Sequence, residues 1–408
     1  MINCVPVLLG GDLNAYSMAM SFADAYGIPS YVLARDRLGI SATSPFVRYG
    51  IVNGLDKCDE AVGALDEIAS RHRGERLLLV PCADWYMEML EYARDVLRGR
   101  FYFNVPSFEC WRTVSDKASF AALMEKFGIP HPVTAVIDRG TESVEETCGS
   151  IKPPFVVKPS DSTEYWRHPF NGMRKTYFAY TLSEARDITR KIFGSGYNGK
   201  VIVQEFFGGS VVDGASASVL TTYSDSSGHV VRAVLGDVLL EDRTATATGN
   251  YSAIVTRALD GISRSLIGML ESIGYTGFAN FDILHCGKKS VCLELNPRQG
   301  RSFDYIRIAG MSAARLLVTE MNGGVHGKKF EYGDGVWSAV PWRTLKAYAK
   351  DRDLYERAEA LKRAGMLFSP YKHKYGEGIK RKLYVAVHLR RESNKYKKAE
   401  RGNADAFE

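Results

Sequence analysis

One stretch decides the fold: Phe278-Ala-Asn-Phe-Asp-Ile-Leu-His-Cys-Gly-Lys-Lys-Ser-Val-Cys-Leu-Glu-Leu-Asn-Pro-Arg298. Two short apolar runs flank a glycine-containing turn, a pattern that predicts an antiparallel β-hairpin. Alternate side chains of a strand point to the same face, so Glu294 and Asn296 share one face of the second strand. Pairing of the two strands brings Asp282 of the first strand to that face.

These polar side chains form a candidate metal site. Two carboxylates and an amide oxygen are the hard oxygen ligands that Mg²⁺ takes, often together with the phosphates of a nucleotide. We therefore expect Asp282, Glu294 and Asn296 to hold one or two Mg²⁺ ions, with the basic Arg298 beside them. The alternative is a hairpin with an acidic outer face and no ligand.

Two lysines upstream of the hairpin are placed to meet an anion. Lys158 directly follows the apolar strand Phe155-Val-Val157, where an amine is costly unless an anionic group contacts it. Lys117 directly precedes a helix expected over 118–127, with Ser115 as its N-cap. A solvated lysine in the first helical turn is the alternative for Lys117.

Together with Lys158-Pro159, the segment Gln204-Glu-Phe206 and the sequence Glu294-Leu-Asn-Pro-Arg298, the hairpin resembles the ATP-grasp superfamily. This resemblance implies an α/β protein with the ATP-grasp fold, which binds ATP and Mg²⁺. In this superfamily two lysines reach the phosphates, a mobile loop closes over them, and a hinge between two lobes holds the adenine and ribose.

The resemblance implies a role for each matching position. The implied nucleotide-binding residues are Lys117, Lys158, Ser160, Ser162, Gln204, Glu205, Phe206 and Asp213. The implied catalytic residues are Arg298, Lys158 and Arg232. The implied metal ligands are Asp282, Glu294 and Asn296.

The sequence pattern also predicts the domain organisation. A strand–helix–strand opening predicts a Rossmann-like pre-ATP-grasp domain over 1–112. The ATP-grasp domain is expected over 113–330, with its small nucleotide lobe at about 130–207, and a helical, basic extension over 331–408. Asp84 follows a predicted strand end, where open α/β sheets place ligand contacts, although a helix N-cap is its alternative role.

Composition places the chain among cytoplasmic globular enzymes. Hydrophobic residues make up 45% and charged residues 25% of the 408 residues, which is ordinary for such proteins. No apolar run approaches the ~20 residues that a membrane span needs. The seven cysteines are scattered without a Cys-x-x-Cys pair, so neither a disulfide framework nor a zinc site is expected.

The positive charge belongs to the C-terminal end. The net charge is +6, and the segment from Lys372 to Lys398 alone holds ten Lys/Arg and two Glu. Within it Ile379, Leu383 and Val387 recur at helical spacing, which indicates an interfacial helix at an anionic membrane or a surface that steers an anionic substrate. A docked helix with a solvated basic face is the alternative. A helix is also expected over about 254–273.

Within the superfamily the chain is most similar to carboxylate–amine ligases, and among these to D-aspartate ligases, which add aspartate to the lysine side chain of peptidoglycan precursors. The similarity lies in Leu9-Gly-Gly-Asp-Leu-Asn-Ala-Tyr16, in Pro341-Trp-Arg343 and in the basic end. It implies an amino-acid donor, an acyl phosphate intermediate and an anionic nucleotide- or lipid-linked muramyl peptide as acceptor.

Other functions remain open on the sequence alone. They are a ligase that joins small soluble amino acids or peptides, a catalytically silent nucleotide-binding protein, and an adaptor that acts mainly through the basic tail. A homodimer is one oligomeric state left open. Nucleic acid is not an expected partner, because no nucleic-acid-binding module is present.

Overall fold

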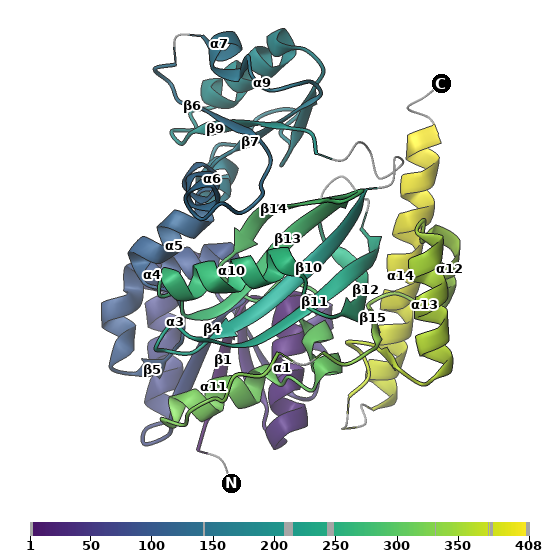
Figure 1. Ribbon diagram of the computed structural model, residues 1–408. Helices are drawn as coiled ribbons and strands as arrows, with labels where there is room; N and C mark the ends of the chain where they lie inside the picture. Colours follow the sequence, from purple (N-terminus) through teal and green to yellow (C-terminus); the bar gives the residue numbers. More distant parts are fainter. Residues whose placement is uncertain are drawn as a thin grey trace.

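The computed structural model contains three β-sheets, and a long helix runs along one side (Figure 1). It describes residues 3–141, 143–207, 215–242, 249–330, 332–373, 375 and 378–404. The mixed α/β fold agrees with the class expected from the sequence.

The N-terminal sheet is parallel and has five strands. In sheet order they are β3 (Val47–Ile51), β2 (Ser30–Ala34), β1 (Val5–Leu9), β4 (Leu77–Pro81) and β5 (Phe101–Tyr102). Its main helices are α1 (Leu13–Tyr26), α3 (Cys58–Arg71) and α4 (Asp84–Arg98), and the short α2 spans Gly39–Ala42. Strands β1 and β4 are buried along their whole length, as expected for central strands of a parallel sheet covered on both faces.

A small four-stranded antiparallel sheet stands apart at the top of the molecule (Figure 1). In sheet order its strands are β6 (Thr134–Ile137), β9 (Val201–Glu205), β7 (Phe155–Pro159) and β8 (Tyr177–Ala179). Helices α7 (Val144–Cys148) and α9 (Leu182–Gly194) pack on it, and α8 (Ser162–Trp166) follows β7. Helices α5 (Phe108–Ser115) and α6 (Lys117–Lys126) connect it to the N-terminal sheet.

The largest sheet has seven strands. In sheet order they are β14 (Lys289–Asn296), β13 (Gly277–Cys286), β10 (Ser216–Ser224), β11 (Val230–Glu241), β12 (Tyr251–Arg257), β15 (Val336–Ser338) and β16 (Leu367–Phe368). Helix α10 (Gly261–Ser272) covers one face. The other face meets the 3₁₀ helix η2 (Phe303–Ala309) and α11 (Ala313–Met321). Strands β13 and β14 confirm the predicted hairpin.

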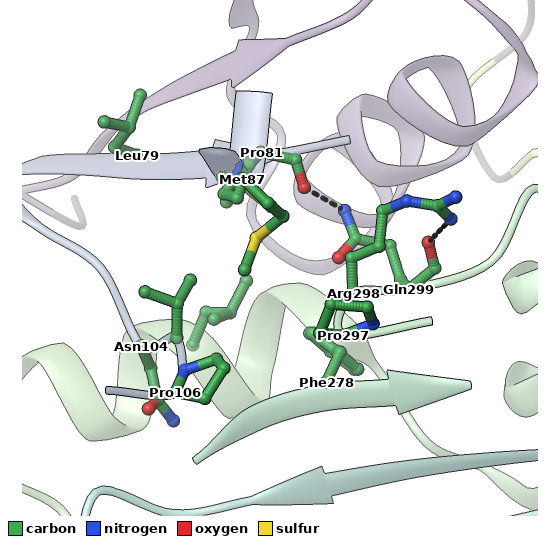
Figure 2. Close-up of a pocket in the computed structure, with 12 residues that line it drawn as sticks. Leu79, Pro81, Met87, Asn104, Pro106, Phe278, Pro297, Arg298 and Gln299 are labelled. Atoms are coloured by element: carbon green, nitrogen blue, oxygen red, sulfur yellow. Dashed lines mark hydrogen bonds between the residues drawn. The ribbon is translucent and has the colours of Figure 1, made fainter. Parts of the chain in front are cut away.

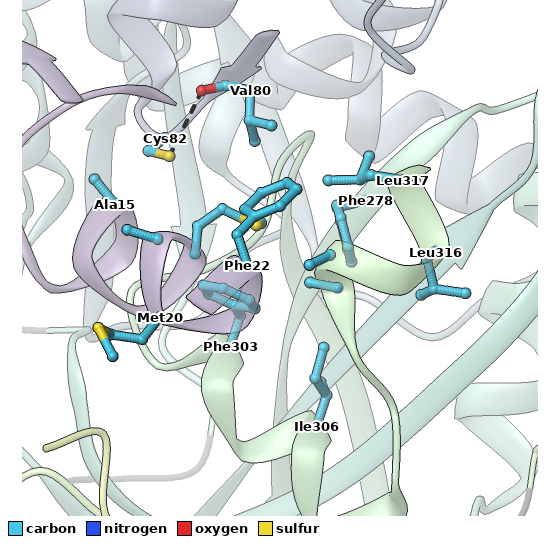
Figure 3. Packing of buried hydrophobic residues seen from close by; sticks show 14 of the residues in the cluster. Ala15, Met20, Phe22, Val80, Cys82, Phe278, Phe303, Ile306, Leu316 and Leu317 are labelled. Atoms are coloured by element: carbon cyan, nitrogen blue, oxygen red, sulfur yellow. Dashed lines mark hydrogen bonds between the residues drawn. The ribbon is translucent and has the colours of Figure 1, made fainter. Parts of the chain in front are cut away.

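One apolar core joins the largest sheet to the N-terminal sheet. Met20 and Phe22 of α1 pack in the same buried cluster as Phe278, Phe303 and the aliphatic residues of α11 (Figure 3). Because this cluster is continuous, the N-terminal sheet and the largest sheet form one rigid base on which the site can be built.

The C-terminal segment is mainly helical, but its strands β15 and β16 belong to the largest sheet. Helices α12 (Trp342–Tyr348), α13 (Arg352–Arg363) and α14 (Ile379–Ala404) lie beside the end of the largest sheet that contains β12 and β15 (Figure 1). In the described part of the chain no helix combines the length and apolarity of a membrane span. All seven cysteines are free thiols.

Two local predictions were wrong. The helix expected over 254–273 begins later, because the β-branched residues at the start of that range form the buried strand β12, hydrogen-bonded to both β11 and β15. A capping box between Asp260 and Ser263 then starts α10. The N-cap of α6 is Asp116 and not Ser115, since the Asp116 carboxylate accepts from the backbone N–H of Ser119 at 2.8 Å.

Candidate active site

The hairpin brings Asp282 and Glu294 directly opposite each other. They are paired across β13 and β14, next to a register shift between Asp282 and Ile283. The hydroxyl of Tyr251 on β12 donates to Asp282 Oδ1 at 3.0 Å, which fixes that carboxylate. Asn296 lies two residues beyond Glu294 on the same face, as predicted. The three candidate metal ligands therefore come together.

Burial and mutual repulsion oppose the simultaneous ionisation of the two carboxylates. Burial raises the pKa of Asp282, and repulsion by the Glu294 carboxylate raises it further, to about 8. Burial also opposes ionisation of Glu294, but the ammonium groups of three lysines lower its pKa overall. Without a bound cation the pair therefore shares one proton over the neutral pH range.

Three lysines face this carboxylate pair from the small sheet and its connections. Lys117 Nζ donates to Ser162 Oγ at 2.8 Å and to the carbonyl oxygen of Ser160 at 3.4 Å. Burial lowers the pKa of Lys158, and Glu294 opposes that shift. An amine whose charge is this costly is suited to meet a phosphate.

The third lysine, Lys175, was missed by the sequence analysis. The Glu294 carboxylate raises the pKa of Lys175, and this effect outweighs the opposing effect of burial. Lys175 lines the same cleft as Lys117, Glu294 and Asn296. In the sequence Lys175 is a basic residue shortly before strand β8, and no motif around it indicates a role in binding. Only the folded path of the loop reveals its position.

The loop after β7 is fixed at both ends. Ser160 Oγ donates to Asp116 and accepts from the backbone N–H of Ala118 at 3.0 Å, so this fully buried hydroxyl ties the loop to α6. At the other end, Arg167 donates to both carboxylate oxygens of Glu88 on α4, at 3.2 and 2.7 Å. Its guanidinium also stacks over the ring of Trp85. The loop thus bridges the small sheet and the N-terminal sheet.

Arg298 is held by the N-terminal sheet. Its guanidinium donates to both oxygens of Asp84, each at 2.8 Å. Asp84 is not the N-cap of α4, because that position is Ala83. Asp84 lines the cleft, as the strand end predicted, and there it is paired with Arg298. A bidentate pair of this kind fixes the plane of the guanidinium, which makes Asp84 a positioning residue for Arg298.

The turn after the hairpin is pinned to the strand ends of the N-terminal sheet. Gln299 Nε2 donates to the Pro81 carbonyl oxygen at 3.1 Å, and Asn14 Nδ2 donates to the Gln299 carbonyl oxygen at 2.8 Å. The segment lines a narrow cavity of about 10 Å³. Figure 2 shows Pro297, Arg298 and Gln299 among the residues that line it. The backbone that carries Arg298 is thus fixed to the same rigid base.

The predicted hinge residues lie at the end of β9. Gln204 Nε2 donates to Thr134 Oγ1 at 2.8 Å, and Glu205 Oε1 accepts from the backbone N–H of Val133 at 3.1 Å. The ring of Phe206 packs against Phe178 at a centroid distance of 5.5 Å. Asp213, the expected ribose contact, lies outside the described residues.

The structure does not bring Arg232 to the carboxylates. Arg232 lies on β11 and is paired with Tyr223 of β10. Asp282 is paired with Val219 of β10, which is four residues away from Tyr223 along that strand. Its guanidinium donates to the carbonyl oxygens of Val231 and Gly327. These contacts tie β11 to the segment after α11, which is a structural role.

Glu294, Asn296 and two of the lysines line a cleft of about 970 Å³. Polar lining residues include Lys117, Ser162, Lys175, Glu294 and Asn296. The same cleft is lined by aromatic side chains from α4, α5 and α8, namely Trp85, Tyr92, Phe108, Trp111 and Trp166. The cleft therefore combines charged groups with a set of aromatic rings.

The donor set fits a divalent cation that shares its ligands with a nucleotide. Among the described residues no group of three or more His, Cys, Asp and Glu side chains could hold a metal ion by itself, so at this place the chain offers two carboxylates and the Asn296 amide. Such a partial set suits Mg²⁺, which usually keeps water and phosphate oxygens as further ligands. The lysines around it would then neutralise those phosphates.

Comparison with known proteins identifies the family. Over 374 residues the chain is 30% identical to the D-aspartate ligase of Enterococcus faecium (strain Aus0004), and the match covers 88% of this chain and 87% of that protein. The chain belongs to the D-aspartate ligase family of ATP-grasp enzymes. It is an ATP-dependent ligase. No protein-family model matches the chain.

More distant proteins share the fold of the ligase. The biotin carboxylase domain of the 2-oxoglutarate carboxylase of Hydrogenobacter thermophilus, solved with MgADP and bicarbonate, has a TM-score of 0.60 at 14% identity, covering 81% of this chain and 73% of that one. The N5-carboxyaminoimidazole ribonucleotide synthetase of Thermus thermophilus has a TM-score of 0.59 at 18% identity, covering 84% of this chain and 86% of that one.

A partial sequence match extends to a larger enzyme. The large chain of carbamoyl phosphate synthase of Rubrobacter xylanophilus is 24% identical over 243 residues, which cover 57% of this chain but 21% of that protein.

We predict that Glu294→Gln lowers turnover by at least about a hundredfold and leaves the fold intact, because it removes a charged ligand from the pair. Turnover is measured as phosphate release, and folding as the thermal unfolding midpoint. The matched control is Glu271→Gln on α10, a residue that pairs with Lys328 at 2.7 Å on the far face of the sheet. Wild-type turnover in Glu294→Gln would contradict the metal assignment.

We also predict that Mg²⁺-nucleotide binding releases a proton. Because the pKa of Asp282 is about 8, the pair is protonated at neutral pH, and a cation that takes both carboxylates displaces the proton. Affinity for preformed MgADP should then fall, by up to about tenfold per pH unit, as the pH drops below that pKa. Calorimetry in buffers of different ionisation enthalpy measures the release. Heats that do not depend on the buffer would contradict the shared proton.

Proposed function

We propose that the ligase joins D-aspartate, or a similar amino acid, to the side-chain amine of a peptidoglycan stem peptide carried by a nucleotide- or lipid-linked muramyl precursor. The observation that carries this proposal is the match to a D-aspartate ligase along almost the whole of both chains. The assembled carboxylates and lysines support catalysis over the alternative of a silent nucleotide-binding protein.

The proposed reaction has two steps. The donor carboxylate oxygen attacks the γ-phosphorus of ATP, which gives an acyl phosphate and ADP. The acceptor amine then attacks the acyl carbon, the amide bond forms, and phosphate leaves with an oxygen that came from the donor. The amine loses a proton in this step. Bound Mg²⁺ would neutralise phosphate charge in the first step.

In this mechanism the side chains position the substrates and neutralise the charge of the phosphates. Lys117, Lys158 and Lys175 offset the negative charge of the phosphates, while Asp282, Glu294 and Asn296 would hold the cation. Arg298, oriented by Asp84, faces the transferred phosphoryl group or the donor carboxylate. The loop that begins at Ser160 and Ser162 excludes water from the acyl phosphate.

The nucleotide base is assigned to the hinge. Gln204, Glu205 and Phe206 would contact the adenine, and Asp213 the ribose. The N–H of Phe206 donates to the Pro154 carbonyl oxygen at 3.1 Å, which continues the antiparallel pairing of β9 with β7 by one residue. The domain boundaries at 112 and 330 remain predictions as well.

The aromatic rings that line the cleft favour a large acceptor over a small amino acid. Tyr92 is 65% exposed and Phe108 is 38% exposed. Their ring centroids are 5.9 Å apart, and the rings of Phe108 and Trp111 have centroids 5.8 Å apart. Exposed rings in a row offer a flat apolar surface to a sugar, a base or a peptide.

The test is phosphate release from ATP and Mg²⁺ across single amino acids, with and without a UDP-linked muramyl pentapeptide. We expect release above background only when D-aspartate and the pentapeptide are both present, and a product heavier by one aspartyl residue in mass spectrometry. L-aspartate is the matched control. Release with two free amino acids would instead support the ligase of small substrates. Bound ATP without release under any condition would support the silent binding protein.

A further inference from the structure

Helix α14 presents two different faces. Its inner face is docked: Arg381 donates to the Ile40 carbonyl oxygen at 2.7 Å and to Thr43 Oγ1 at 2.6 Å, next to α2. Further along the helix, Tyr396 donates to Ser252 Oγ on β12 at 2.7 Å. These contacts at both ends hold the helix rigidly against the body of the protein.

The outer face carries an exposed apolar stripe. Ile379, Leu383 and Val387 are 86%, 66% and 44% exposed. They follow one another at four-residue intervals, which aligns them along one side of the helix. Large aliphatic side chains are rarely left this exposed in a row without a binding partner.

Basic side chains surround this stripe. The exposed basic residues of α14 up to residue 398 are Lys380, Lys382, Arg390, Arg391, Lys397 and Lys398. The acidic residue within that span, Glu392, is 8% exposed and is paired with Lys395 at 2.8 Å. From residue 379 to 398, which the structure describes without a gap, the outer face therefore carries no exposed acidic group.

A neighbouring loop extends the same chemistry. Leu38, which is 42% exposed, precedes Gly39, and Gly39 packs closely against the Tyr384 ring of α14. Arg37, just before Leu38, is exposed beside the exposed Asp36, while Arg35 pairs with Asp56 at 3.5 Å. The apolar surface of the stripe thus continues onto Leu38 of the N-terminal sheet, and the positive charge of the face comes from α14.

From this face we infer that the ligase docks on the surface of an anionic lipid bilayer. Aliphatic side chains ringed by Lys and Arg match a bilayer interface, where the apolar tips enter the headgroup region and the basic groups meet lipid phosphates. A soluble polyanion would use the charges but would leave the stripe in water. The helix is already folded and docked, so binding does not require ordering of the segment.

This inference does not depend on the identity of the substrates. The stripe lies on a helix that supplies none of the residues lining the cleft or the carboxylate site. Substitutions in the stripe should therefore leave phosphate release in solution unchanged, which separates surface binding from catalysis.

The experiment is co-sedimentation of the full chain with vesicles of phosphatidylcholine, with or without phosphatidylglycerol. We expect binding to the phosphatidylglycerol vesicles and little to the neutral ones, with a decrease at high salt. Leu383→Glu should reduce partitioning by at least about tenfold, because it places a carboxylate in the headgroup region and removes an apolar contact. The matched control is Val325→Glu, at a position 92% exposed after α11, which should bind like the wild type.

A second variant separates charge from apolar contact. Replacing Lys380, Lys382 and Arg390 together by Gln keeps the stripe and should also weaken binding to the anionic vesicles. The proposal is overturned if the wild type does not sediment with these vesicles, or if Leu383→Glu partitions like the wild type. It is also overturned if the protein binds heparin or DNA through these residues while ignoring the vesicles.

Discussion

The site depends on one unfavourable arrangement, the pairing of two carboxylates across the β13–β14 hairpin. Asp282 on β13 and Glu294 on β14 are directly paired across the two strands, and like charges in such a pair repel each other. Their proximity is tolerated because lysines from another part of the molecule face them and because a proton or a cation can lie between them. The hairpin alone therefore makes only half of the site.

The other half comes from the small sheet and its loop. Lys158 and Lys175 are carried by the small sheet and its connection, and Lys117 by the helix that leads into it. The N-terminal sheet supplies a third contribution, because Asp84 orients Arg298 and Glu88 holds Arg167 of the loop. A site assembled from three parts can exclude water when they close and release product when they open.

The sequence predicted the hairpin, the carboxylate pair and the placement of Lys158, because strand alternation and a costly buried lysine can be recognised locally, whereas the assignment of Lys117 came from the family resemblance. It did not predict Lys175, whose role depends on how a loop folds back over a distant hairpin. It also did not predict the Asp84–Arg298 pair, which joins residues far apart in sequence. The error over 254–273 has a tertiary cause: β12 is a strand because β11 and β15 hydrogen-bond to it on both sides.

The central claim is that this cleft activates a carboxylate by phosphoryl transfer. The most direct test uses D-aspartate labelled with oxygen-18 in its carboxylates, together with ATP, Mg²⁺ and the muramyl pentapeptide, and follows the label by mass spectrometry. The account predicts that the released phosphate carries one labelled oxygen from the donor. Unlabelled phosphate accompanying amide formation would contradict it, since the bond would then form without an acyl phosphate.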